Sequence, residues 1–233
     1  MQKPTECCEP TIRIGRSRPM NEQTERRVTL EKEGIAELEE KKSIFIGRAK
    51  PVANEEEAQS YIKEIRAKFP DARHHVWAYR LQGDVVMRCS DDGEPQGTGG
   101  VPTLDVLKKS GVSNAVVVVT RYFGGILLGA GGLVRCYSKA AMLAVREAGV
   151  VTMEKCRCWR LTCSYSEHPR ILAELPKFGA EIGETTFAER VALFFTVRAN
   201  AEQNLLIRLR EMSGGTVEPE QIGEIFLPVR EEN

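Results

Sequence analysis

The sequence predicts an α+β protein with two folded units, and three observations carry this prediction. An apolar strand, Ala115 to Thr120, leads into a glycine-rich loop and then a helix. Before it, an amphipathic helix over 54–69 separates segments with strand-like alternation. After Gly149 the pattern runs strand, helix, strand, strand, helix, strand, which is the βαββαβ order of a ferredoxin-like domain. With 233 residues, of which 42% are hydrophobic, the chain can bury one large core or two modest ones.

A mobile tail over 1–24 and a domain over 25–150 are predicted for the first part of the chain. The tail has little to bury, whereas the alternation from Arg27 to Val52 fits two or three strands. Asn54 followed by Glu57 predicts a helix start, and Pro70 ends that helix. Its apolar residues fall on one face: Ala58, Tyr61, Ile62, Ile65 and Phe69.

The elements that follow are a hairpin, a short helix, a buried strand and a long helix. The hairpin is expected to turn at Gln82 to Asp84. Pro102 suits the first turn of the short helix, which ends before Gly111. The strand over 115–120 is too uniformly apolar for a sheet edge, so we expect it to be covered on both faces. The long helix is expected over 133–148.

A short linker over 149–154 and a ferredoxin-like domain over 155–228 complete the prediction. Strands are expected at 157–165, 184–188, 190–199 and within 216–228. A helix over 169–178 should kink or end early at Pro176. A second helix is expected to start at a cap on Asn200, with Gln203 three residues on, and to end at Gly214.

Composition bounds the possible partners. Residues 1–153 carry 23 basic and 20 acidic side chains, a net charge of +3, and residues 154–233 carry 10 and 13, a net charge of −3. Such values do not indicate a bulk nucleic-acid binder, so an anion site must come from local clustering. Seven cysteines without a C-x-x-C pair, and no stretch of about 18 apolar residues, favour a reducing cytoplasm and no membrane partner. No cofactor or metal site is indicated, and the oligomeric state is left open.

The glycine-rich loop over 124–132 is the strongest local indication of function. It lies in a window without acidic residues, between Asp105 and Glu147. Arg121 precedes the loop, and Arg135 and Lys139 follow it on one face of the predicted helix. A strand, a glycine loop and a helix start expose backbone N–H groups that can hold an anion. The loop is neither a Walker A motif nor a G-x-G-x-x-G fingerprint, so we do not predict nucleotide hydrolysis or dinucleotide binding.

The acidic run Asp91, Asp92, Glu94 has three interpretations. It can be a solvated turn, a magnesium-type site or general base, or a set of carboxylates that pair with Arg73 or Arg121 and order the loop. No second acidic cluster completes a metal site. His74 and His75 should point to opposite faces of their strand, so one is expected to be structural. Cys89 and Cys136 have no activating neighbour in the sequence.

Three blocks of the sequence resemble the Impact/YigZ family: RHHVWAY, SDDGEPQGTGGVP and VVVVTRYFGGILLGAGGLVRCYSKA. They span residues 73–140, and the flanking elements extend the resemblance to about 25–228. The resemblance implies an N-terminal domain like domain 2 of ribosomal protein S5 and a C-terminal domain similar to late domains of elongation factor G. Eukaryotic members restrain an amino-acid-starvation kinase by competing for its activator. The resemblance therefore implies translational control, with RNA or a ribosome-associated protein as partner.

Residue by residue, the resemblance adds a shared surface to the loop and its basic neighbours. Leu127 and Gly99 depart from it, because many relatives have Lys and Ala there, and the missing lysine removes one anion contact. The shared surface includes Gly93, Pro95 and Gly97, which lie within and just after the acidic run. The predicted binding residues are His74, Asp91, Asp92, Glu94, Thr98, Arg121, Tyr122, Gly124, Gly125, Gly129, Gly131, Gly132, Arg135 and Lys139.

The leading hypothesis is a cytosolic binding protein that recognises RNA phosphates, and we lean away from an enzyme. Two rivals belong to other classes. One is a metal-assisted hydrolase that uses the acidic run and His74. The other is a protein-interaction module in which Phe187, Phe194 and Phe195 of the C-terminal sheet contact a partner.

Overall fold

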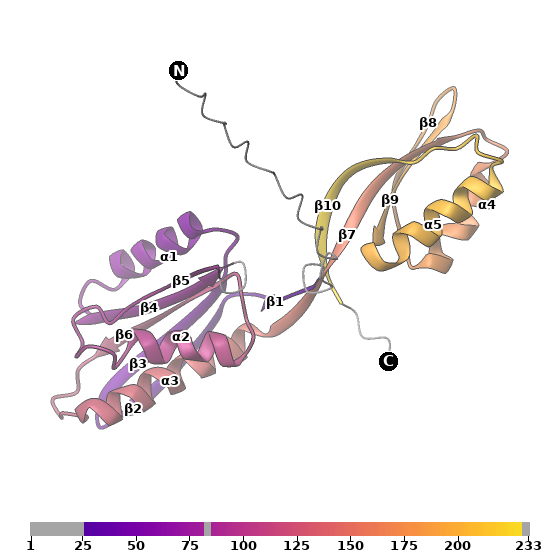
Figure 1. Ribbon diagram of the computed structural model, residues 1–233. Helices are drawn as coiled ribbons and strands as arrows, with labels where there is room; N and C mark the ends of the chain where they lie inside the picture. The colour runs from indigo at the N-terminus through magenta and orange to yellow at the C-terminus, as the bar shows by residue number, and fades with distance from the viewer. Residues whose placement is uncertain (1–25, 82–84, 230–233) are drawn as a thin grey trace, which may run out of the picture.

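The computed structural model describes residues 26–81 and 85–229. They form two mixed α+β units, each built on an antiparallel sheet, that lie apart as two lobes joined by the long strand β7 (Figure 1). The predicted hairpin turn at Gln82 to Asp84 and the N-terminal segment 1–24 lie outside the described residues. No helix in the described ranges is long and apolar enough to cross a membrane.

The first unit is a five-stranded sheet with helices on both faces. Its strand order is β2 (Gly34–Glu40), β3 (Ser43–Pro51), β6 (Ala115–Tyr122), β4 (His74–Leu81) and β5 (Val86–Ser90). Every neighbouring pair is antiparallel. The central strand β6 therefore has a partner along each edge.

Helix α1 (Glu55–Lys68) covers one face of this sheet, and α2 (Gly100–Lys109) and α3 (Gly129–Ala148) cover the other. Val116 and Val118 of β6 pack under α1, whereas Val117 and Val119 pack under α3. All four valines are fully buried. The prediction of a strand covered on both faces is confirmed.

The helix boundaries follow the local chemistry of the chain. The Asn54 side chain accepts a 2.9 Å hydrogen bond from the Glu57 backbone N–H, which confirms the predicted cap of α1. Helix α3 begins at Gly129, four residues before the predicted start, because Gly131 and Gly132 of the loop lie in its first turn. Glycine is a poor helix former, so apolar periodicity does not reveal this turn.

The second unit is a ferredoxin-like fold with β7 (Val150–Cys163), α4 (His168–Glu174), β8 (Glu181–Phe187), β9 (Val191–Arg198), α5 (Ala199–Met212) and β10 (Glu220–Pro228). The βαββαβ prediction is confirmed, and the strand order is β8, β9, β7, β10. Pro176 lies in a 3₁₀ turn that replaces the end of α4, as expected of a residue without an N–H. Helix α5 starts one residue before Asn200, at Ala199, and Arg198 is its N-cap without a side-chain hydrogen bond.

The segment over 150–154 is a strand and not the predicted linker. It forms the first part of β7, where β1 (Arg26–Leu30) pairs along one edge and the end of β10 along the other. The buried carboxylate of Glu154 in this segment lies 3.2 Å from Arg26 and 3.3 Å from Arg198. Leu30 of β1 packs into the core of the first unit, so β1 contributes to both units.

Candidate functional site

Asp91 orders the acidic loop between β5 and α2. Its carboxylate accepts hydrogen bonds from the backbone N–H groups of Gly97, Gly99 and Gly100, at 2.9, 2.9 and 2.8 Å. Burial acts to raise the pKa of Asp91, but these three hydrogen bonds outweigh it and hold the pKa below its usual value. Asp91 thus caps the start of α2 from a distance, where the helix has no local side-chain cap.

Asp92 connects the acidic loop to the strand and helix next to it. Its carboxylate accepts from the backbone N–H of His75 at 2.7 Å and from Arg66 at 2.5 Å. Its carbonyl oxygen lies 2.8 Å from Nδ1 of His74, so this nitrogen must carry the hydrogen. Thr98 also turns inward, because its hydroxyl donates to the Pro95 carbonyl at 2.6 Å.

Glu94 is the buried centre of a polar cluster. Its Oε1 accepts from Nη1 of Arg121 at 2.5 Å and from the Tyr137 hydroxyl at 2.7 Å, and lies 4.0 Å from Nε2 of His74. Burial, followed by the hydrogen bond to Glu94, raises the pKa of Tyr137 far above its usual value, so the hydroxyl remains a donor. The hypothesis that a carboxylate of the acidic run pairs with Arg121 is confirmed.

His75 is the structural member of the histidine pair. It is buried, with Nε2 3.1 Å from the Phe69 carbonyl and Nδ1 3.2 Å from the Thr120 hydroxyl. Burial is the main reason that the pKa of His75 is lowered. The prediction that one of the two histidines is structural is therefore confirmed, whereas His74 keeps its Nε2 directed to the Glu94 cluster.

The three carboxylates of the acidic run point to different partners. Asp91 faces backbone amides, Asp92 faces Arg66 and Glu94 faces Arg121. Within the described ranges, no group of three or more His, Cys, Asp or Glu side chains is placed to hold a metal ion. The metal-site interpretation of the run therefore lacks a ligand set there.

Arg121 lies under the surface and supports the glycine loop. Only 6% of the residue is exposed. Its guanidinium carbon lies 5.3 Å from the Phe45 ring centre and 5.6 Å from that of Phe123, within the range of a cation–π contact. Its neighbour Tyr122 reaches Asp71, with 3.3 Å between the hydroxyl and the carboxylate. The structure thus gives Arg121 a positioning role, and the exposed cations of the predicted site lie elsewhere.

The glycine loop lies against the turn between β2 and β3. The Gly124 backbone N–H donates to the Ser43 hydroxyl at 3.1 Å, and a Cβ on Gly124 would lie 2.0 Å from the Lys42 carbonyl carbon. This approach requires glycine and brings Lys41 and Lys42, both exposed, next to the loop. Sequence analysis missed these lysines, although an adjacent Lys pair between two alternating segments predicts an exposed turn.

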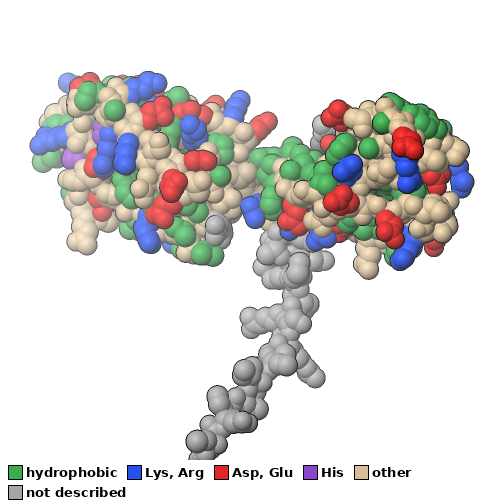
Figure 2. Space-filling model, turned by 90° about the horizontal axis from the view of Figure 1, so that it is seen from above, with side chains coloured by type: hydrophobic (Ala, Val, Ile, Leu, Met, Phe, Trp, Pro, Cys, Tyr) green, Lys and Arg blue, Asp and Glu red, His purple; other side chains and the backbone are tan. Residues whose placement is uncertain are grey.

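The start of α3 leaves backbone N–H groups at an exposed position. Gly129 and Gly131 are exposed, the helix has no side-chain cap, and its first turn has no acidic residue. Arg135 and Lys139 are exposed on the following turns, and neither forms a salt bridge within 26–81 and 85–229. We call the set Lys41, Lys42, Arg135 and Lys139 the cationic rim. Figure 2, which views the first unit from the side of α1, shows Lys and Arg side chains at its outer end and Asp and Glu side chains among and beside them.

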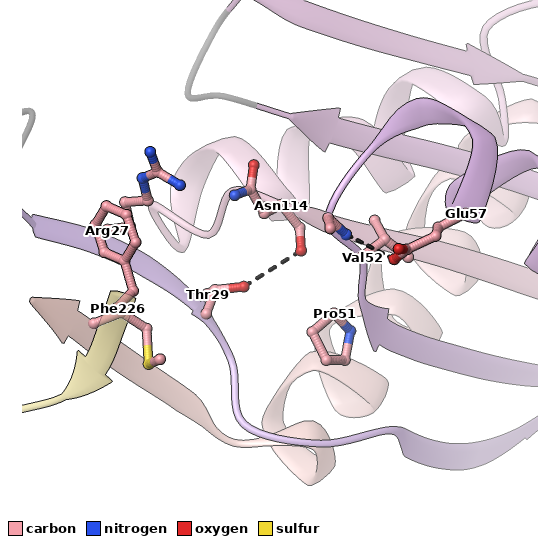
Figure 3. Close-up of a pocket in the computed structure, with 9 residues that line it drawn as sticks. Arg27, Thr29, Pro51, Val52, Glu57, Asn114 and Phe226 are labelled. Carbon is pink, nitrogen blue, oxygen red and sulfur yellow. Dashed lines mark hydrogen bonds between the residues drawn. The ribbon is translucent and has the colours of Figure 1, made fainter. Parts of the chain in front are cut away.

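A separate pocket of about 260 Å³ lies at the junction of the two units (Figure 3). Arg27 stacks on the Phe226 ring at 3.8 Å on one side, and Glu57 accepts from the Ala53 backbone N–H at 2.8 Å on the other. The Thr29 hydroxyl donates to the Asn114 carbonyl at 3.3 Å. None of the predicted binding residues lines this pocket.

Comparison with known proteins identifies both units. The Impact N-terminal domain profile matches residues 41–145, and that of a domain of unknown function, DUF1949, matches residues 161–216. IMPACT family member YvyE of Bacillus subtilis is 38% identical over 70% of this chain and 76% of its own length. The chain belongs to the IMPACT family. The matched range of the Impact N-terminal domain contains all the predicted binding residues.

Other relatives in the IMPACT family cover more of this chain. IMPACT family member YigZ of Escherichia coli is 34% identical over 76% of this chain and 89% of its own length. A solved structure, described as the crystal structure of a hypothetical protein, is 32% identical and superposes with a TM-score of 0.58 over 85% of this chain and 98% of that chain. Both units are therefore shared with these relatives.

Proposed function

We propose that this protein is a cytosolic regulatory protein, linked to translation or the stress response, that binds RNA phosphates at the outer end of its first unit. The observation that carries the proposal is the cationic rim around the uncapped start of α3. Four exposed cations lie on the turn before β3 and on α3, and the first backbone N–H groups of α3 have no side-chain cap. Lys and Arg side chains and helix N-termini are the groups that proteins use for phosphate contacts.

Two features favour a polymer over a small nucleotide. The rim is exposed, and the pockets at the junction and on the second sheet are lined by other residues. A small ligand needs a concave site that covers most of its surface. A polyanion gains affinity from several exposed contacts, each of which releases counterions.

The test is RNA affinity as a function of salt concentration, measured by fluorescence anisotropy. We expect the affinity of the wild-type protein to fall as salt rises, with a slope of about 0.7 per phosphate contact on a single strand. The double variants Lys41→Ala/Lys42→Ala and Arg135→Ala/Lys139→Ala should each weaken binding and flatten this slope. The matched control is Lys108→Ala/Lys109→Ala, which removes the same charge from the last turn of α2, outside the rim.

Equal effects of the rim and control variants would reject the rim as the binding surface. Wild-type binding that is absent, or that does not change with salt, would reject the proposed function itself.

A second candidate function is protein binding by the second unit, which Phe187 favours. The residue is 61% exposed, and its ring lies 6.3 Å from that of Tyr165, itself 56% exposed. Exposed aromatic residues are common centres of protein interfaces. Phe195, in contrast, is buried in the core of the unit and Phe194 is half-buried. Affinity capture with and without nuclease separates this candidate from the first, because a direct protein partner survives nuclease and Phe187→Ala releases it.

A further inference from the structure

The glycine loop exposes apolar side chains as well as backbone. Phe123, Ile126 and Leu127 are 42%, 44% and 83% exposed. They belong to the loop between β6 and α3, which lies against Lys42. Single exposed apolar residues are ordinary on protein surfaces, but three on one short loop form a patch that needs explanation. Phosphate contacts alone do not use such a patch.

The Phe123 ring is held in place from two sides. The Arg121 guanidinium, fixed by Glu94, lies 5.6 Å from the ring centre. Gly124, the next residue, is in contact with the Lys42 backbone. Ile44 of β3 pairs with Tyr122 of β6 in an antiparallel ladder. Lys42 lies two residues before Ile44 and Phe123 one residue after Tyr122, so both lie at the same end of the two strands. The ring therefore stands in a defined position next to an exposed lysine turn.

We propose that the RNA bound by this surface is single-stranded, with one base stacked on Phe123 and the neighbouring phosphates on the cationic rim. This inference rests on the proposed function and specifies its ligand. An unpaired base has a free π-face, and stacking on an aromatic side chain is the usual contact of such bases. The bases of an A-form duplex are stacked internally, so a duplex offers phosphates to the rim and no surface to Phe123.

The charge around the ring supports this ligand over an acidic protein segment. No acidic residue occurs in the sequence between Asp105 and Glu147, so the loop and most of α3 contribute no carboxylates of their own. Glu39 and Glu40 at the end of β2 are exposed, and Glu40 acts on Cys136 of α3 together with Arg135 and Lys139, so it borders the cations there. A strand with a phosphate at every nucleotide can follow the run of cations from the loop along α3. The loop also supplies one fixed aromatic ring. One base of a single strand can stack on it while the phosphates on either side of that base contact the cations.

The experiment compares an unstructured oligouridylate with an RNA duplex that has the same number of phosphates. We expect the wild-type protein to bind the single strand more tightly. Phe123→Leu, which keeps an apolar side chain but removes the ring, should weaken single-strand binding about tenfold and leave its salt slope unchanged. It should also abolish the fluorescence change of a 2-aminopurine base placed in the single strand. Phe187→Leu is the matched control, because it removes an exposed ring from the second unit.

The outcomes separate this inference from the proposed function. Salt-dependent binding that is equal for duplex and single strand, or equal loss in Phe123→Leu and Phe187→Leu, overturns the stacking inference and leaves phosphate recognition standing. The absence of salt-dependent RNA binding in the wild-type protein overturns both.

Discussion

The acidic loop and the glycine loop face each other across Arg121, yet they use their polar groups in opposite ways. In the acidic loop, Asp91, Asp92 and Glu94 accept hydrogen bonds from groups within the first unit. In the glycine loop and the following turn of α3, backbone amides and cations face solvent. The loop that is richest in chemically versatile side chains is thus the structural one. The loop that is poorest in side chains is the candidate binding surface.

This difference shows that a reactive residue type indicates a ligand site only when its hydrogen-bonding capacity is left open. A buried carboxylate that is already paired stabilises the fold and has little to offer a ligand. Three variants measure how far the division between the two loops holds.

The largest effect is expected for Glu94→Ala. The variant leaves the Arg121 guanidinium and the Tyr137 hydroxyl buried without their shared acceptor. Breaking a buried ion pair from one side costs about 3–5 kcal/mol in the free energy of unfolding. Urea unfolding followed by circular dichroism measures this loss.

The exposed Glu147→Ala on α3 is the control for Glu94→Ala and should change stability by less than about 0.5 kcal/mol. The double variant Glu94→Leu/Arg121→Met should recover part of the loss, because neither charge then remains buried alone. A Glu94→Ala protein as stable as Glu147→Ala would show that the acidic loop does not hold the first unit together.

An intermediate effect is expected for Asp91→Asn, about 1–3 kcal/mol at neutral pH, because the amide has one uncharged acceptor oxygen where the carboxylate has two charged ones. The folded-state pKa of Asp91 lies below its unfolded value. The stabilisation is therefore complete above the ordinary Asp pKa of about 4 and declines as the pH falls through the folded-state pKa.

The stability difference between wild type and Asp91→Asn, measured by urea unfolding across this range, should shrink toward acid. Asp105→Asn on the same helix is the control, since Asp105 accepts no hydrogen bond from residues 26–81 and 85–229. A difference that stays constant with pH would mean that the carboxylate charge is not what orders the loop.

The smallest effect is expected for Gly131→Ala and has the opposite sign. A Cβ at this position meets nothing within 4 Å, and alanine favours the helix over glycine by about 0.5–1 kcal/mol. The variant should therefore raise the melting temperature slightly while it weakens RNA binding, because the added methyl group stands beside the exposed amides. Gly124→Ala should instead destabilise the protein, since its Cβ would overlap the Lys42 backbone. Gains of both stability and affinity in Gly131→Ala would contradict the amide contact.

Much of the fold could be predicted because its determinants are local. The alternation of the strands, the Asn54 cap and the valines of β6 report burial residue by residue. The pairing of β1 with β7 could not be predicted, because partners more than a hundred residues apart are set by the packed chain and leave no local pattern. Residues 150–154 form a strand for the same reason, since their partners in β1 and β10 are distant in the sequence.

The sequence indicates which residues belong to the site, but not which of them contact each other. The sequence indicates that Glu94 and Arg121 matter, but whether they pair with each other or face a ligand depends on their burial. Lys41 and Lys42 join the rim only because Gly124 lets two distant turns touch. No spacing within the sequence encodes that contact.

Strand β7 also ties together the first and last strands of the described chain. It pairs with β1, which is made before it, and with β9 and β10, which are made after it. During synthesis, the edge of β7 that receives β10 stays open until residue 228 has been added. An open edge is a template for pairing with other chains. Loss of the last strand by premature termination is therefore expected to produce an aggregating protein, even though the first unit and its loops would already be complete.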